Sequence, residues 1–192
     1  MDARVHYLQG KTEGLTGRAD GDIPNVQNEL QQLLTDLAAE RVALIERHEA
    51  GARAVSHYDF NNTYQYVIAR EETHLGWLGD ALTELGAALP KASASLPVPA
   101  IGKVGKKVEA SAFKAIFDDD VRTLGAFVQK WRPKVDALTH ARHRTMLNVV
   151  LGESLEHQRL FSQAAAGFED LLGKRTGGVA RVGGVLPARW QE

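Results

Sequence analysis

The chain has 192 residues, with 23 Lys and Arg against 24 Asp and Glu, and a formal net charge of −1. At about 150 residues per domain, this length predicts one domain with extensions. The balanced charge argues against a nucleic-acid partner, which usually selects for a basic excess. The sequence contains no Cys, which excludes disulfides, thiolate zinc sites and iron–sulfur clusters.

No apolar run near the start has the length of a signal peptide, and no later run approaches the ~18 residues that span a membrane. We therefore expect a soluble, cytoplasmic protein without membrane contact. The predicted organisation is an N-terminal extension over 1–21, a helical bundle over 22–173 and a C-terminal tail over 174–192.

Apolar residues recur at intervals of three and four, the period of an amphipathic helix. The spacing predicts an all-α protein with four long helices, over 24–55, 59–87, 107–131 and 134–172. Asp22 and Pro24 suit the start of the first helix, Asp59 or Ser56 can cap the second, and Gly173 is a natural stop for the last.

The connections between the helices predict two hairpins. A tight turn near residues 56–59 joins the first pair, and another near Pro133 joins the second. Between the pairs lies a stretch of about 20 residues rich in Pro, Ser, Gly and Lys, which could cover ~65 Å when extended. A 28-residue helix is ~42 Å long. Two hairpins joined by one long crossover form the ferritin-like arrangement of a four-helix bundle.

Each predicted helix carries an acidic residue on its apolar stripe. The stripe positions are Glu40 on the first helix, Glu71 with His74 on the second, Asp120 on the third and Glu153 on the fourth, with Glu156 or His157 beside it. An uncompensated buried carboxylate costs several kcal/mol, so four in register need a shared cause. Basic partners such as Arg70, Arg142 or Lys114 are one explanation, and two divalent metal ions are the other.

The segment Arg70-Glu71-Glu72-Thr73-His74 resembles the Glu-x-x-His segment of bacterioferritins and rubrerythrins, in the ferritin-like di-metal carboxylate superfamily. The resemblance covers about residues 24–172. In this superfamily the paired ligands of a hairpin lie a little over thirty residues apart. Glu71 follows Glu40 by 31 residues here, and Glu153 follows Asp120 by 33.

Carried over onto this sequence, the resemblance implies six metal-ligand positions, with seven candidate residues for them, and one nearby tyrosine. Glu40 would be a terminal ligand, Glu71 and Glu153 would bridge two ions, and His74 would bind one of them. Asp120 would take the position on the third helix, with Glu109 as the alternative. The last ligand would be Glu156 or His157, because a strict Glu-x-x-His that begins at Glu153 would place its His at 156, where this sequence has Glu and the His follows at 157. Tyr64, on the stripe of Glu71, would lie beside the site.

The resemblance implies two iron ions, or iron with manganese, and oxidation of Fe(II) or activation of O₂ or peroxide. Position 72 is Glu rather than Met, so no bacterioferritin-style haem is expected. Ferroxidase, peroxidase and oxygenase activities share this ligand set and stay open. The alternative is a metal-degenerate ferritin-like protein with a structural or partner-binding role.

The tail has five glycines between Gly173 and Gly184, too many for a stable helix. Its apolar residues could dock on a partner: Val185, Leu186 and Trp190. Because ferritin-like bundles commonly associate, we expect a homo-oligomer.

Overall fold

The computed structural model describes residues 22–101, 110–169 and 171–172, so the predicted extension over 1–21, the tail over 174–192 and Glu109 lie outside it. Its helices are α1 (Asp22–Ala54), α2 (Tyr58–Glu84), η1, a short 3₁₀ helix (Ala110–Phe113), α3 (Lys114–Asp136) and α4 (Ala141–Ala165). The described residues contain no strand, which confirms the predicted all-α class. No helix among them is long and apolar enough to cross a membrane.

Two glycines follow helices that end earlier than the sequence pattern predicts. Gly86 (φ 76°) and Gly167 (φ 83°) adopt the left-handed conformation that favours glycine. After α2, Ala87 N–H donates to Leu82 O, and after α4, Phe168 N–H donates to Gln163 O. Both ends are therefore Schellman motifs, and the predicted stop of the last helix at Gly173 is wrong.

The turn between α3 and α4 also differs from the prediction. Pro133 lies inside α3, which continues to Asp136, because a proline near the end of a helix removes only one hydrogen bond. Val135 is fully buried beyond it, so its burial favours the extra turn of helix. At the start of α2 the N-cap is His57, without a side-chain capping bond, rather than Asp59 or Ser56.

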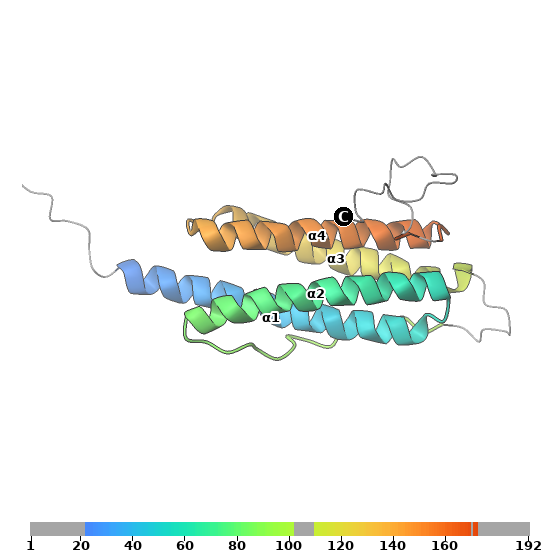
Figure 1. Cartoon of the computed structure of the whole chain (residues 1–192), viewed down its shortest axis with the longest axis horizontal. Helices are drawn as coiled ribbons and strands as arrows, with labels where there is room; N and C mark the ends of the chain where they lie inside the picture. The colour runs from blue at the N-terminus through green and yellow to red at the C-terminus, as the bar shows by residue number, and fades with distance from the viewer. Residues whose placement is uncertain (1–21, 102–109, 170, 173–192) are drawn as a thin grey trace, which may run out of the picture.

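The helices form two antiparallel hairpins, α1 with α2 and α3 with α4, stacked on each other (Figure 1). The long crossover leaves the end of α2 and runs the length of the bundle along α1 toward the start of α3 (Figure 1). Ser93 N–H donates to Ala39 O at 3.0 Å, which fixes the crossover to α1. This confirms the predicted ferritin-like connectivity.

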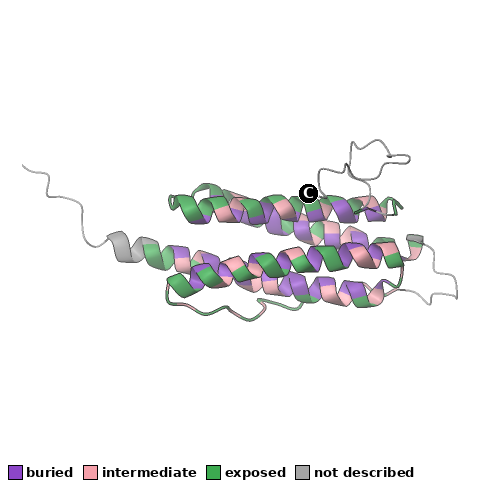
Figure 2. Cartoon of the chain, in the orientation of Figure 1, coloured by how far each residue is buried: buried purple, intermediate pink, exposed green. Residues whose placement is uncertain are grey.

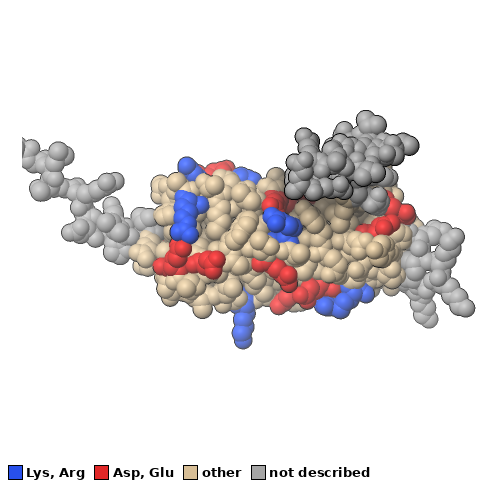
Figure 3. All heavy atoms as spheres, in the orientation of Figure 1, with Lys and Arg blue, Asp and Glu red and all other residues tan. Residues whose placement is uncertain are grey.

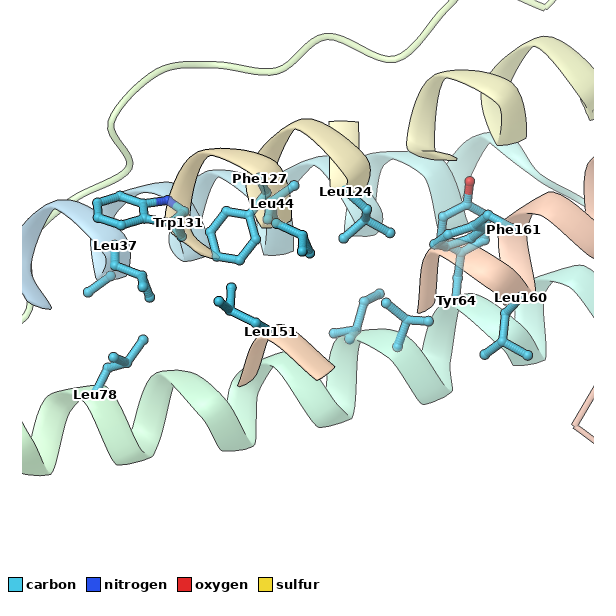
Figure 4. Packing of buried hydrophobic residues seen from close by; sticks show 14 of the residues in the cluster. Leu37, Leu44, Tyr64, Leu78, Leu124, Phe127, Trp131, Leu151, Leu160 and Phe161 are labelled. Carbon is cyan, nitrogen blue, oxygen red and sulfur yellow. The ribbon is translucent and has the colours of Figure 1, made fainter. Parts of the chain in front are cut away.

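The buried face of each helix points inward, and the outer faces are exposed (Figure 2). Toward the α1–α2 turn the core is aromatic, with the rings of Tyr64 and Phe161 4.8 Å apart and those of Phe60 and Phe117 4.9 Å apart. Figure 4 shows Tyr64 beside Phe161 at this end, and Trp131 near Leu37 at the other. The polar core residues described below lie in the same buried interior.

Gly51 of α1 is where the backbone meets the Tyr64 ring. A Cβ at this position would lie 2.8 Å from Cε1 and 2.9 Å from the Tyr64 oxygen, closer than carbon contacts allow. Gly76, in the middle of α2, has open space instead.

We therefore predict opposite effects for two glycine substitutions. Gly51→Ala overpacks the core and should lower the free energy of unfolding by roughly 1–3 kcal/mol. Gly76→Ala should raise it by roughly 0.5–1 kcal/mol, because alanine favours an exposed helix. Urea unfolding followed by circular dichroism measures both, and equal effects of the two substitutions would contradict the packing described for Tyr64.

Candidate functional site

A buried arginine lies at the centre of the polar core. Arg41 of α1 has a fully buried side chain, and its Nη1 donates to Glu71 Oε1 of α2 at 2.7 Å. Its Nη2 donates to Ser154 Oγ of α4 at 2.8 Å. The guanidinium carbon lies 4.5 Å from the centre of the Phe127 ring of α3. One cationic side chain therefore touches all three other helices.

Glu71 accepts a second hydrogen bond on its other oxygen. His48 Nδ1–H of α1 donates to Glu71 Oε2 at 2.7 Å, and both side chains are fully buried. Burial by itself would raise the pKa of Glu71, but His48 and Arg41 outweigh it and hold the pKa far below its usual range. Glu71 is thus a carboxylate at neutral pH, with both oxygens engaged by α1.

Two further buried histidines flank this pair. His157 of α4 has Nδ1 3.9 Å from Glu71 Oε1, and its ring stacks on that of His74 at 6.4 Å between centres. His74 Nε2–H donates to Glu153 Oε2 at 3.0 Å, and Glu153 also accepts from Arg70 Nε at 2.8 Å. Burial, and then the charge of Arg41, lower the pKa of His74 to about 4, so its ring is neutral at pH 7.

Asp120 of α3 lies in a second buried group, toward the α1–α2 turn. Arg47 Nε donates to Asp120 Oδ1 at 2.8 Å, and the Tyr64 hydroxyl donates to Oδ2 in a short hydrogen bond. Burial raises the pKa of Asp120, although His48 and Arg47 act against it. Tyr64 therefore lies beside Asp120, and in the described part of the chain His48 links this group to Glu71, with Nε2 3.8 Å from Asp120 Oδ1.

The remaining predicted ligands point elsewhere. Glu40 bonds to Lys130 and accepts from Trp131 Nε1 at 2.9 Å, at the edge of the bundle. Glu156 is exposed and pairs with Arg159 at 2.8 Å. The structure thus brings Glu71, His74 and His157 together in the core with Glu153 at their rim. It places Asp120 in a neighbouring group and separates Glu40 and Glu156 from both.

Buried charge is balanced among the described residues. The buried Arg, Asp and Glu side chains among them are two arginines and two acids: Arg41, Arg47, Glu71 and Asp120. Across residues 22–101, 110–169 and 171–172, no three His, Asp or Glu side chains are arranged so that they could hold one metal ion. The assignment of the seven residues as metal ligands stays a prediction.

Four residues of this network are absent from the sequence-based prediction: Arg41, Arg47, His48 and Ser154. A signal for three of them exists in the sequence. On α1 the buried positions 34, 37, 41, 44, 48 and 52 keep one rhythm of threes and fours, which selects Arg41 over Glu40. On α4, Ser154 and His157 repeat the spacing of Glu71 and His74, with serine in place of glutamate.

We predict that the core charges are coupled in pairs. Arg41→Met leaves Glu71 buried without the arginine that pairs with its Oε1 and should cost about 3–5 kcal/mol of folding free energy. Adding Glu71→Gln removes the orphaned charge, so the double variant should recover most of that loss. Urea unfolding of the two single variants and the double variant tests this, and additive losses would contradict the coupling.

We also predict a pH dependence that traces to His74. Because its folded pKa of about 4 lies below the ordinary 6.5, the unfolded chain binds an extra proton between these values. Stability should therefore fall as the pH drops from about 6.5 to 4, by up to about 3 kcal/mol from this group. His74→Gln should flatten this part of the profile, as measured by urea unfolding at pH 7 and 5. An unchanged slope would exclude His74 as the cause.

No family model and no curated protein matches the chain. Several solved structures resemble it, among them the following three. A conserved hypothetical protein from Mycobacterium tuberculosis is 19% identical, with a TM-score of 0.55 over 72% of this chain and 96% of that one. A dodecameric thioferritin from Bacteroides fragilis, described as bacterioferritin-related, is 14% identical, with a TM-score of 0.56 over 78% and 94%. A protein from Xanthomonas campestris is 14% identical, with a TM-score of 0.50 over 74% and 92%. These likenesses, together with the hairpins and the crossover, show that the chain has the ferritin-like four-helix fold.

Proposed function

We propose that this chain is a metal-degenerate ferritin-like protein with a structural or partner-binding role, in which buried arginine side chains pair with the core acids. One observation carries the proposal. Arg41 lies between Glu71 of α2 and Ser154 of α4 and bonds to both. The superfamily draws its Glu-x-x-His ligands from these two helices. The permanent positive charge of Arg41 there stabilises the buried carboxylate of Glu71, as the charge of a metal ion otherwise would.

The donor set fits two metal ions poorly. Four carboxylates of the bundle normally hold such a pair of ions. In this chain Ser154 stands at the Glu position of the second Glu-x-x-His, and Glu71 is already paired with Arg41. Two divalent ions would bring four positive charges into a core whose buried arginines and carboxylates already balance. The cost of that excess charge in a buried site is large.

A specific observation favours the second candidate, the di-iron protein predicted from the sequence. Nδ1 of His74 and Nδ1 of His157 are buried without a hydrogen-bond partner among the described residues. A histidine that binds a metal through one nitrogen usually donates the other to a carboxylate, as His74 Nε2–H does to Glu153. In this alternative Glu71, His74 and His157 would hold iron, with Arg41 turned away, and oxidation of Fe(II) would follow.

Iron content after anaerobic Fe(II) loading separates the two candidates. We expect the wild-type chain to retain no stoichiometric iron after desalting. We expect the double variant Arg41→Glu, Ser154→Glu to retain iron, because it restores two core carboxylates beside Glu71, His74 and His157. Elemental analysis gives the stoichiometry, and circular dichroism shows whether each variant is folded.

About two iron ions per wild-type chain, lost in Glu71→Ala, would reject the metal-degenerate assignment and support the di-iron protein. Oxygen consumption on addition of Fe(II) would then show whether the protein is a ferroxidase. Glu156→Ala serves as the matched control, because Glu156 is an exposed acid that lies away from the core.

A further inference from the structure

The two hairpins meet along two seams, and the crossover covers one of them. Along the seam between α1 and α3, Pro97 O accepts from Arg47 Nη1 at 2.7 Å, and Leu96, Val98 and Ile101 pack against the core. The described part of the crossover follows α1, away from α4 (Figure 1). The seam between α2 and α4 has no such covering segment within the described residues 85–101.

Apolar side chains lie along this uncovered seam. Tyr66 of α2 and Val149 of α4 are each 42% exposed, although both are large apolar residues. Trp77 and Met146 lie on the same faces of α2 and α4 by helical spacing, and both are half-buried. Because α2 and α4 run antiparallel, these four residues form one strip along the seam. We call it the α2/α4 strip.

An ion pair divides the α2/α4 strip. Arg70 of α2 and Glu153 of α4 are bonded at 2.5 Å, with side chains 35% and 30% exposed. Tyr66 lies on one side of the pair, and Trp77, Met146 and Val149 lie on the other. Figure 3 shows this face of the molecule in front, with broad uncharged areas between a few small clusters of charge.

We propose that the α2/α4 strip binds the same strip of a second copy of this chain. A two-fold interface brings one patch against itself, so its charges must match themselves. The seam meets this condition, because its cations and anions are equal in number: Arg70 pairs with Glu153 within the strip, and Arg142 of α4 pairs with Glu84 of α2 at 2.8 Å beyond it. An antiparallel copy can set its Glu153 against Arg70. Tyr, Trp, Met and Arg are also the residues enriched in protein interfaces.

This inference names the partner in the proposed structural role and rests on that role, but its test does not involve iron. Sedimentation of the full chain at several concentrations should give a mass of at least twice the 21.0 kDa of one chain. Val149→Glu places a buried charge in each half of the interface and should raise the dissociation constant at least tenfold. Tyr66→Glu should act in the same direction.

Leu155→Glu is the matched control. Leu155 is on the same helix and 45% exposed, but helical spacing places it on the side of α4 toward α3. Its substitution should leave the dissociation constant unchanged, and circular dichroism should show equal helix content for all variants.

A wild-type chain that sediments at 21.0 kDa at every concentration would overturn the proposal. So would equal weakening by Leu155→Glu, or assembly that withstands both Val149→Glu and Tyr66→Glu. Loss of assembly in Trp190→Ser alone would assign the contact to the C-terminal tail instead. The metal-degenerate assignment would stand in each case, since it depends on iron content.

Discussion

The buried ion pair between Arg41 and Glu71 constrains how three helices pack in the core. A guanidinium and a carboxylate lose their hydration when fully buried, and their mutual attraction offsets that cost only if the remaining donors and acceptors are also bonded. Ser154 accepts from Arg41 and His48 donates to Glu71 on the two sides of the pair, which leaves Arg41 Nε as the one donor of the pair that is buried without a partner among the described residues. Small shifts of α4 or α1 would leave a charge unpaired, so the pair fixes the register of three helices.

Arg47 plays the corresponding part at the other buried group. It binds Asp120 in the core, Asp119 at 2.6 Å near the surface and the carbonyl of Pro97 in the crossover. One side chain from α1 thus connects α3 to the segment that leads into it. The crossover is held by directional bonds as well as by its apolar residues, which explains how a proline-rich stretch keeps one path along the bundle.

Periodicity in the sequence is enough to predict the two hairpins, the crossover and the burial of Glu71, His74 and Asp120, but it leaves Glu156 and His157 as alternatives, of which only His157 is buried. It did not separate neighbouring positions that differ by 100° around a helix. At 40 and 41, and again at 153 and 154, the apolar pattern predicts that the acidic residue points inward, whereas the inward residues are Arg41 and Ser154. Arginine is rarely fully buried, so composition gave no reason to choose it. The contact between Arg47 and Asp120 spans 73 residues, and no local pattern encodes such a distance.

The division of buried charge between the hairpins has a consequence for folding. The first hairpin buries two arginines and one glutamate, while the second buries one aspartate. Each hairpin alone therefore holds an unbalanced charge on the face that is buried in the bundle, positive on the first hairpin and negative on the second. The two unlike faces attract each other through water, whereas two copies of the same face repel each other. The same charges that are costly to bury thus help to select the correct partner while the bundle assembles.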